Sequence, residues 1–435
     1  MIITKKIRVF PSVVQQKVLL DLSEKCRLIY NFALKERIDN WAENKIKTKE
    51  DRMYITYNKQ QDDLPSLKKK YPEYKWNYSK VYQGTLKKLD ADYKSFFASW
   101  KNGDLNARLP RFKGKHHFTV LVYNQSGFKI DENSIVFSHK HPSAIPLKFK
   151  IDYSSSNGEK IKQVEIFNDS REKWFITLSI EFNEPAYIDN GLYQAIDLGI
   201  INITTAVNSS GKFIQIKNQR SDLYWKNKIE EVHSWRDHCK KHSKKWNFYN
   251  KKLKRMQRNL ANQMKDFQHK ISKKIVENTR ANTIIIGDLD IKDMSRHEKD
   301  TGNPRQNKAR KTLHHSLQST GSMGRFAEFL TYKAEKIGKR VTRIDESMTT
   351  KTCCICGKIR HRKLSERTII CDCGNIIDRD KNSAVNIMIR FLSRESLLNG
   401  ELLKQEFLIN LHRQTALPVV EAAMDSMRTR NLISG

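Results

Sequence analysis

The chain has 435 residues, of which 81 are Lys or Arg and 48 are Asp or Glu, so its net charge is +33. This excess favours a polyanionic partner, most simply nucleic acid, over a merely soluble, lysine-rich surface. No apolar run reaches the roughly eighteen residues of a membrane span, no signal-peptide core follows the first residues, and seven cysteines favour metal binding in a reducing cytoplasm over disulfides.

The N-terminal part is predicted to be one strand followed by helices. Lys6–Phe10 has strand character, and Ser12 with Gln15 forms a capping box, the pattern that opens a helix. Apolar residues then recur at steps of three and four, and they do so again from about 80 to 100, so we expect two packed helices. Residues 45–75 show no clear period and are predicted to be a loop-rich connection.

From residue 119 to 182 the apolar period changes to two, which indicates strands. Turn-forming clusters separate the short runs. We expect a small β-barrel, with the N-terminal strand completing it and the two helices as an insertion. The predicted strands are 118–123, 128–130, 134–137, 148–151, 162–167 and 174–181.

A second domain is predicted to begin at Gln194. The apolar strand Gln194–Ile200 carries Asp197, and β-like runs at 203–207 and 213–216 follow it. Three antiparallel strands that open with an aspartate are typical of ribonuclease H-like folds.

A long basic helical pair is predicted for residues 220–280. One face keeps an apolar stripe from Leu253 to Ile275, which predicts core or helix–helix contact. The other face carries cations, which suit a surface that follows phosphates. The cations of this region are Arg236, Lys240, Lys241, Lys244, Lys245, Lys251, Lys252, Lys254, Arg255 and Arg258.

Two later strands each lead to an acidic residue. The β-branched run Thr283–Gly287 is predicted to be a buried parallel strand, and Asp288 follows it. The strand Arg340–Asp345 delivers Glu346. Residues 295–320 are polar and without period, so we expect a mobile segment over the site.

Two close cysteine pairs predict a zinc ribbon. Cys353 and Cys356 have C-x-x-C spacing, Cys371 and Cys373 have C-x-C spacing, and a glycine follows each pair. Two tight turns of this kind present four thiolates to a tetrahedral Zn²⁺. Cys354 does not fit the spacing, so we leave it outside the metal shell.

Directly behind the ribbon, Asp378-Arg379-Asp380 stands where a loop becomes an apolar-periodic helix. Acidic residues held there suggest a second metal site near the ribbon. Arg379 either steers phosphate or pairs with Asp378, and we favour a role that supports the site.

With these motifs the chain resembles the TnpB family, the transposon-encoded RNA-guided DNA nucleases related to type V CRISPR effectors. The likeness extends over almost the whole chain and ends at about Ser393. The matching segments are VFPSVVQQ, RLIYNFALKER, LPRFKGK, AIDLGI, FQHKISKKIV, IIIGDLDIKDM, GRFAEFLTYKAEKIGKRV, TTKTCCICG and CGNIIDRDKNSAVNI.

The resemblance implies an α/β fold plus a small β-barrel, with a structural Zn²⁺ and two Mg²⁺ ions. It implies a guide RNA from the protein's own locus, a double-stranded DNA target and a cytoplasmic, nucleoid-associated location. We expect a monomer, with a dimer as the alternative. The implied domains are a wedge barrel at 1–10 and 116–185, a helical recognition insertion at 11–115, a RuvC nuclease domain at 191–350 and 378–395, a zinc ribbon at 351–377 and a C-terminal extension at 396–435.

In the family three carboxylates hold the two Mg²⁺ ions, and here the second is missing. Asp197 matches the first position and Asp380 the third, but Gly287 stands where the family has glutamate. Glu346 is the favoured substitute, because neighbouring parallel strands lie about 4.8 Å apart and a glycine leaves room. Asp288 is the second hypothesis, although a strand neighbour points to the opposite face. The third is a dead metal site.

The predicted function is therefore RNA-guided DNA cleavage by two-metal catalysis. One alternative is an RNA-guided DNA-binding protein without nuclease activity, similar to a repressor. Another is a DNA-strand-transfer transposase, since the same fold and carboxylates serve transesterification. A copurifying structured RNA would separate the first two from the third, and Mg²⁺-dependent cleavage would separate a nuclease from a binding module.

Overall fold

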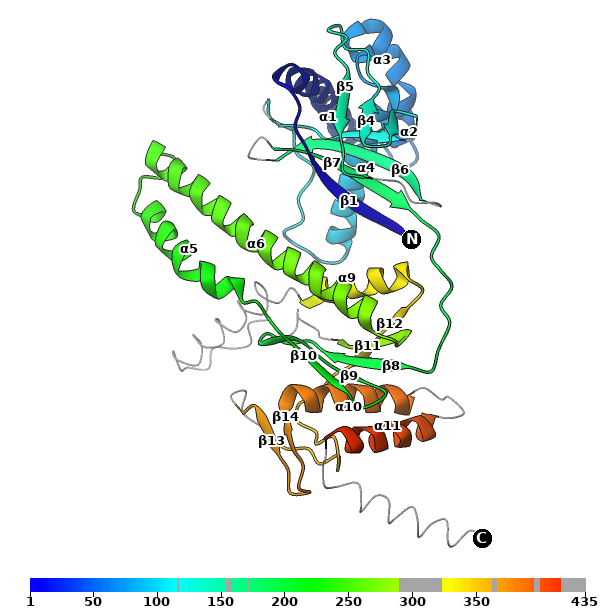
Figure 1. The fold of residues 1–435 in the computed structure, drawn as a ribbon. Helices are drawn as coiled ribbons and strands as arrows, with labels where there is room; N and C mark the ends of the chain where they lie inside the picture. Colours follow the sequence, from blue (N-terminus) through cyan, green and yellow to red (C-terminus); the bar gives the residue numbers. More distant parts are fainter. Residues whose placement is uncertain are drawn as a thin grey trace. The chain divides into compact units, whose positions relative to one another are not determined.

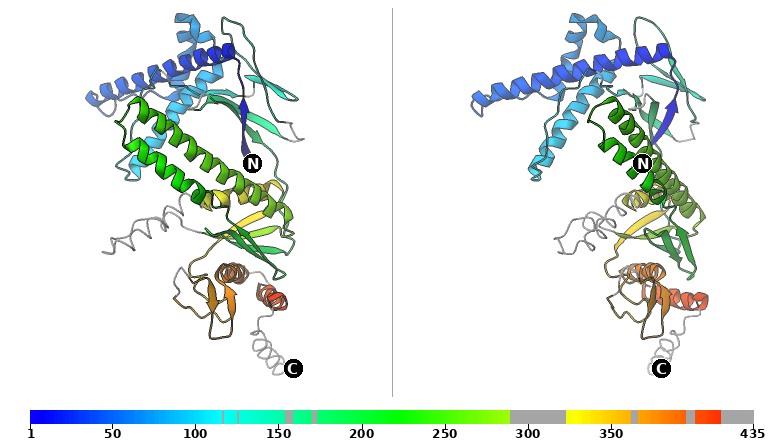
Figure 2. Two further views of the ribbon diagram at one scale, coloured as in Figure 1. Left: turned by 60° about the vertical axis from the view of Figure 1, so that its left-hand side comes forward. Right: turned by 90° about the vertical axis from the view of Figure 1, so that its left-hand side faces the viewer.

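The structure is a computed structural model of the chain. It divides into two compact units, Met1–Asn183 and Glu184–Gly435 (Figures 1 and 2). The predicted mobile segment at 295–320 lies outside the described residues. The structure describes residues 1–115, 117–124, 126–153, 159–169, 173–288, 323–361, 366–394 and 400–415.

The helices of the first unit begin where the sequence predicts. Helix α1 (Val13–Ile46) opens with the predicted capping box: the N–H of Gln15 donates to Ser12 Oγ at 3.2 Å, and the N–H of Ser12 donates to Gln15 Oε1 at 3.0 Å. Helix α4 (Ser79–Lys101) confirms the second prediction.

The loop prediction for 45–75 is wrong in part. Helices α2 (Tyr57–Asp62) and α3 (Leu64–Lys70) and the 3-10 turn η1 (Pro72–Lys75) occupy its second half. These helices are one or two turns long, too short to display a period of 3.6. Local contacts hold them instead, such as the bond from Gln60 Nε2 to the carbonyl of Ala33 at 2.9 Å.

The strands of the first unit form two antiparallel sheets, of order β1-β7-β6-β2 and β3-β4-β5. Both contribute to one apolar core with α1 and α4. Among the described strands no ladder joins the two sheets, so a closed barrel stays a prediction. The strands are β1 (Ile2–Val9), β2 (Leu121–Asn124), β3 (Phe128–Asp131), β4 (Ser134–Phe137), β5 (Leu147–Lys150), β6 (Lys160–Asn168) and β7 (Trp174–Glu181).

The second unit is built on a five-stranded sheet of order β10-β9-β8-β11-β12 (Figure 1). The middle strand β8 pairs in parallel with β11, which pairs in parallel with β12, whereas β9 and β10 are antiparallel to their neighbours. The predicted strands are confirmed within a few residues. They are β8 (Tyr193–Asp197), β9 (Asn202–Asn208), β10 (Phe213–Lys217), β11 (Thr283–Asp288) and β12 (Arg340–Asp345).

Helices cover both faces of this sheet. Side chains alternate along a strand, so Ala195 of β8 packs among residues of α10 (Arg379–Arg394) and α11 (Gly400–Thr415). Its neighbour Ile196 packs on the other face with α6 (Lys244–Asn278) and α9 (Met323–Lys336). The end of β8 is therefore held rigidly between two apolar layers.

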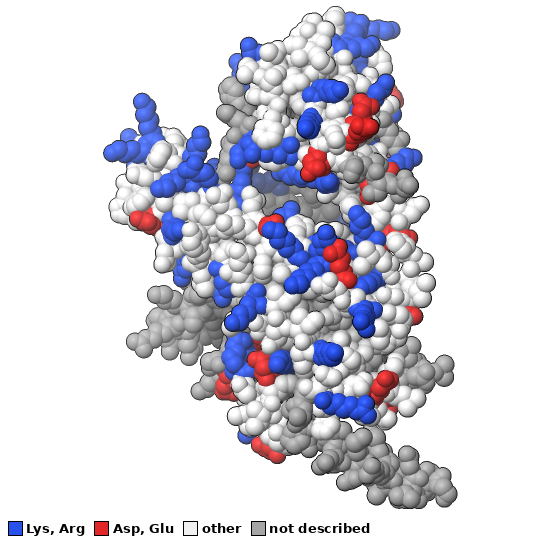
Figure 3. Space-filling view, in the orientation of Figure 1, with Lys and Arg blue, Asp and Glu red and all other residues white. Residues whose placement is uncertain are grey.

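The predicted basic helical pair is confirmed as α5 (Ser221–Asp237) and α6, which pack against each other as a hairpin (Figure 2). Its outer part is rich in Lys and Arg side chains (Figure 3). Exposed cations of the hairpin are Lys240, Lys241, Lys244, Lys245, Lys251, Lys254 and Arg255.

The C-terminal extension contributes to the second core. Phe407 and Leu411 of α11 are almost fully buried. The helix lies so close to the β9–β10 turn that a Cβ on Gly211 would be 2.7 Å from the Leu411 Cα, and Gly211 also has a φ of +77°. Among the described helices, none is long and apolar enough to cross a membrane.

Candidate metal centres

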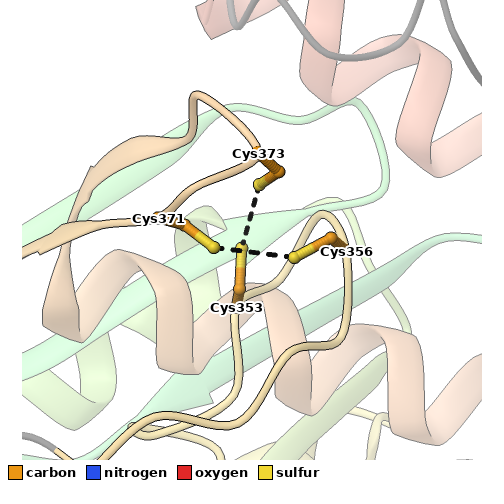
Figure 4. Close-up of side chains that lie close together, drawn as sticks. All are labelled: Cys353, Cys356, Cys371 and Cys373. Carbon is orange, nitrogen blue, oxygen red and sulfur yellow. Dashed lines mark hydrogen bonds between the residues drawn. The ribbon is translucent and has the colours of Figure 1, made fainter.

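The four cysteines of the predicted ribbon converge (Figure 4). Their sulfurs all lie within 4.8 Å of one another, with Cys353 Sγ 3.7 Å from Cys373 Sγ and Cys356 Sγ 3.6 Å from Cys371 Sγ. Strands β13 (Thr368–Ile370) and β14 (Ile376–Asp378) form the hairpin that carries the second pair. Four sulfurs from two tight turns fit a structural zinc site.

Cys354 lies outside this group. Its thiol is buried, and burial raises its pKa to about 12, so it stays a neutral thiol. Burial also opposes ionisation of Cys353, but hydrogen bonds from the Cys356 N–H and Asn375 outweigh it and lower the Cys353 pKa to about 7. The amide of Asn375, a fully buried residue, donates to Cys353 Sγ at 3.3 Å. Asn375 therefore supports the Cys353 thiolate, a role that sequence reasoning missed.

Two asparagines of α10 clamp the loop that opens the ribbon. Asn382 accepts from the N–H of Cys354 at 2.9 Å and donates to the carbonyl of Thr352 at 2.8 Å. Asn386 donates to the carbonyls of Thr349 and Thr352, both at 2.8 Å. Hydrogen bonds thus join the loop that leads into the ribbon to α10, the helix that also carries Asp380.

Asp197 and Asp380 come from different elements and face the same region. Asp197 ends β8 and is only 9% exposed; burial, then the charges of Glu346 and Asp380, raise its pKa well above the ordinary value. Asp380 stands in the first turn of α10, where Asn202 donates to its Oδ2 at 3.0 Å. The structure therefore brings three of the predicted site residues together.

Asp378 and Arg379 support Asp380. Asp378 Oδ1 accepts from the N–H groups of Asp380 and Lys381, both at 3.1 Å, so it caps α10. Arg379 Nε lies 3.8 Å from Asp380 Oδ1. Arg379 thus lies beside Asp380, and its supporting role stays a prediction.

Glu346 fills the space beside Gly287. Gly287 pairs in parallel with Ile344 at the end of β12, so the residue two positions later lies next to it. A Cβ built on Gly287 would overlap Glu346 Oε2 and would lie 2.9 Å from the Cβ and Cδ of Glu346. Burial, and then the charges of Asp288 and Asp345, raise the pKa of Glu346 to about 7.

The side chain of Asp288 points away from the space beside Gly287. It is exposed, and its Oδ1 lies 3.6 Å from Arg343 NH1 on the neighbouring strand. This is the outcome that alternation along a strand predicts, because Gly287 faces the site. Glu346, and not Asp288, therefore fills the space that a side chain on Gly287 would need.

The three carboxylates could hold hard divalent cations. Such ions prefer oxygen ligands, and three carboxylates approach one region in which Glu346 Oε2 is buried without a hydrogen-bond partner among the described residues. Among these residues only the cysteine group has all its ligand atoms within 4.8 Å. The carboxylates are more widely spaced, as a site for two ions about 3.5–4 Å apart allows.

Three family models match separate parts of the chain. A model described as "Helix-turn-helix domain" matches residues 1–45, "Probable transposase" matches 182–298, and "Cas12f1-like, TNB domain" matches 324–387. The last covers Glu346, all four zinc-ribbon cysteines and Asp380.

Two relatives match the chain over most of their length. A Streptomyces pristinaespiralis protein named "Putative RNA-guided DNA endonuclease" is 24% identical over 86% of this chain and 85% of its own. An Escherichia coli (strain K12) protein of the same description, InsQ, is 27% identical over 88% of this chain and 91% of its own.

The fold is shared with a solved Cas12f1–sgRNA–target DNA complex. The TM-score is 0.54 at 12% sequence identity, and the match covers 89% of this chain and 98% of that chain. At this identity the likeness shows a shared fold alone; with the family models and the two named relatives, it makes the chain similar to the TnpB-like RNA-guided DNA endonucleases.

Proposed function

We propose that the protein is an RNA-guided DNA endonuclease that hydrolyses phosphodiester bonds of a guide-matched target at the site of Asp197, Glu346 and Asp380. The two relatives that match nearly full length carry this activity in their names. The observation that carries the proposal is the position of Glu346, whose carboxylate fills the space that Gly287 leaves open. A chain without need of metal would have no reason to place a third acid here with its Oε2 buried.

Each residue of the site has a definable task. Asp197, Glu346 and Asp380 would hold two Mg²⁺ ions, which supply an activated water and stabilise the leaving oxygen when bound. Asn202 orients Asp380 by its bond to Oδ2. Burial of Asp197 and of Glu346 Oε2 excludes bulk water and raises the pKa of both acids, so a bound cation would stabilise their ionised forms.

The basic surfaces would bind the nucleic acids. The α5–α6 hairpin presents exposed lysines such as Lys244, Lys251 and Lys254 over several helical turns, and rows of cations follow phosphate backbones. We propose a guide RNA and a double-stranded DNA target as the ligands. The wedge barrel, recognition insertion and RuvC domain with its zinc ribbon are the corresponding domains.

A second candidate is an RNA-guided DNA-binding protein without nuclease activity. The replacement of the expected glutamate by Gly287 favours it. The burial and placement of Glu346 argue against it, since a dead site would not require an acid there. A strand-transfer transposase remains the third candidate, in keeping with the "Probable transposase" family match.

The test begins with the RNA that copurifies with the full chain. We expect a structured RNA, and we expect the complex to cleave a plasmid that carries the guide-matched sequence only when Mg²⁺ is present. Asp197→Asn should abolish cleavage and keep guided binding. A protein without RNA, which binds DNA with no preference for a guide, would contradict the proposal. Guided binding without wild-type cleavage would select the second candidate.

A further inference from the structure

A chain of two buried hydroxyl groups connects Asp197 to the Glu346 loop. Ser383 Oγ donates to Asp197 Oδ1 at 3.0 Å, and Ser383 Oγ lies 2.9 Å from Thr349 Oγ1. Thr349 then contacts the carbonyl of Glu346 with its Oγ1 at 2.8 Å and its N–H at 3.1 Å. Thr349 is 2% exposed and Ser383 is fully buried, so water does not compete for these bonds.

From this geometry we infer that Thr349 and Ser383 are positioning residues, which fix Asp197 and Glu346 relative to each other for metal binding. The inference rests on the proposed function, because it assigns a task at the same carboxylate site. Neither hydroxyl is proposed as a metal ligand. Both act through the carboxylates that they hold.

Glu346 needs such support because no strand holds it. It follows the last residue of β12, and its Oε2 has no hydrogen-bond partner among the described residues. Its side-chain position therefore depends on its backbone, and Thr349 holds that backbone at the carbonyl. The same Thr349 reaches Ser383 on α10, the helix that also carries Asp380.

The hydroxyl chain has a direction when Asp197 is ionised. Two hydroxyl hydrogens serve three oxygen–oxygen contacts, and a carboxylate only accepts. Ser383 must then donate to Asp197, so its Oγ can only accept from Thr349, whose single hydroxyl hydrogen is shared between Ser383 Oγ and the carbonyl of Glu346. The carbonyl of Glu346 also accepts a hydrogen bond from the N–H of Thr349. The bridge thus engages Oδ1 of Asp197, and Oδ2 is the oxygen that would be left for a metal ion.

A merely structural role would also explain buried hydroxyl groups, so the test must separate metal affinity from stability. Thr349→Val keeps the side-chain volume and removes the hydroxyl, whereas Thr349→Ser keeps the hydroxyl and removes the methyl. Ser383→Ala removes the second hydroxyl. Ser272→Ala is the matched control, because Ser272 is fully buried in α6 and donates to the carbonyl of Gln268 at 2.7 Å.

The measurement is Mn²⁺ binding to the full-length, zinc-loaded chain, followed by electron paramagnetic resonance, with thermal unfolding of the same samples. Asp197→Asn identifies the signal of this site. We expect Thr349→Val and Ser383→Ala to weaken Mn²⁺ binding about tenfold or more, the usual effect of losing a group that holds a metal ligand. Thr349→Ser should bind as the wild type does, and Ser272→Ala should lower the melting temperature without changing Mn²⁺ affinity.

Two results would overturn the positioning role and the proposed function separately. If the wild type binds Mn²⁺ at the Asp197 site and Thr349→Val and Ser383→Ala bind it equally well, the positioning role is wrong and the proposed function stands. If the wild type binds no Mn²⁺ that depends on Asp197, the proposed catalytic site is wrong, and the bridge loses its task with it.

Discussion

The carboxylate of Glu346 occupies the space that a side chain at Gly287 would need, and a Cβ on Gly287 would lie 2.9 Å from the Glu346 Cβ. Gly287 lies in β11, and Glu346 follows the last residue of the neighbouring parallel strand β12. Glu346 can therefore occupy this space only while position 287 carries no side chain, and each position constrains the other.

A side chain at Gly287 should be tolerated poorly. Gly287→Ala forces the Glu346 side chain to move, and overpacking of this kind costs about 1–3 kcal/mol of unfolding free energy. Gly114→Ala is the matched control, because a Cβ there meets nothing within 4 Å. Urea unfolding of both variants checks this, and equal stability would contradict the close packing of the two residues.

Exchanging the residues at positions 287 and 346 should restore the cleavage activity that Gly287→Glu alone abolishes. Gly287→Glu alone puts two carboxylates into one space and should abolish cleavage. Gly287→Glu combined with Glu346→Gly returns one acid to the site, so we expect guided cleavage to recover in part. Rates of plasmid cleavage at saturating Mg²⁺ test this, and a double variant as inactive as the single one would count against a shared task.

Metal binding should depend on pH through Glu346. Its pKa is raised to about 7 from an ordinary value of 4.5, so the metal-free fold gains stability from this proton below about pH 4.5 and loses it as the pH rises through about 7. Mg²⁺ needs the ionised form, so the rise in melting temperature that Mg²⁺ causes should be larger at about pH 8 than at about pH 6.

Glu346→Gln is the control for this pH dependence. Glutamine does not titrate, so the difference between the two pH values should shrink. Some of it should remain, because burial also raises the pKa of Asp197. If Glu346→Gln keeps the full difference between the two pH values in the rise of melting temperature, other groups cause the pH dependence.

The zinc site should need the four ribbon cysteines and should not need Cys354. Cys353→Ser should lower bound zinc from about one ion per chain to near zero and should lower the melting temperature, since structural zinc stabilises the fold that holds it. Cys354→Ser should keep its zinc, because the Cys354 thiol lies outside the sulfur group. Zinc content measured by mass spectrometry decides, and zinc loss in Cys354→Ser would contradict the assigned shell.

Helix α11 should be part of the stable core. Leu411 is 1% exposed and Leu402 is 64% exposed on the same helix. Leu411→Ala should therefore cost about 2–5 kcal/mol of unfolding free energy, whereas Leu402→Ala should change it by less than about 0.5 kcal/mol. Similar effects of both changes would show that α11 does not dock as described.

Sequence reasoning located the elements that carry strong periodic patterns. The capping box at Ser12, the strand that ends at Asp197 and the ribbon cysteines all follow from local spacing, and the structure places them accordingly. The proximity of Glu346 to Gly287 was also predictable, because parallel neighbours align their ends.

Long-range polar contacts were not predictable in this way. Ser383 and Asp197 are 186 positions apart, and no local pattern marks either as the other's partner. The bond of Asn375 at the zinc site and the packing of α11 against Gly211 were not predicted either. Such pairings depend on the complete fold, which a single sequence does not display.

The most direct test of the central claim compares Glu346→Gln with Asp288→Asn in guided, Mg²⁺-dependent plasmid cleavage. Both changes remove a negative charge and keep the side-chain size. We predict that Glu346→Gln lowers cleavage by several orders of magnitude with guided binding intact, and that Asp288→Asn cleaves as the wild type does. Cleavage that survives Glu346→Gln and is lost in Asp288→Asn would show that Asp288 supplies the second carboxylate, and would contradict the catalytic role of Glu346.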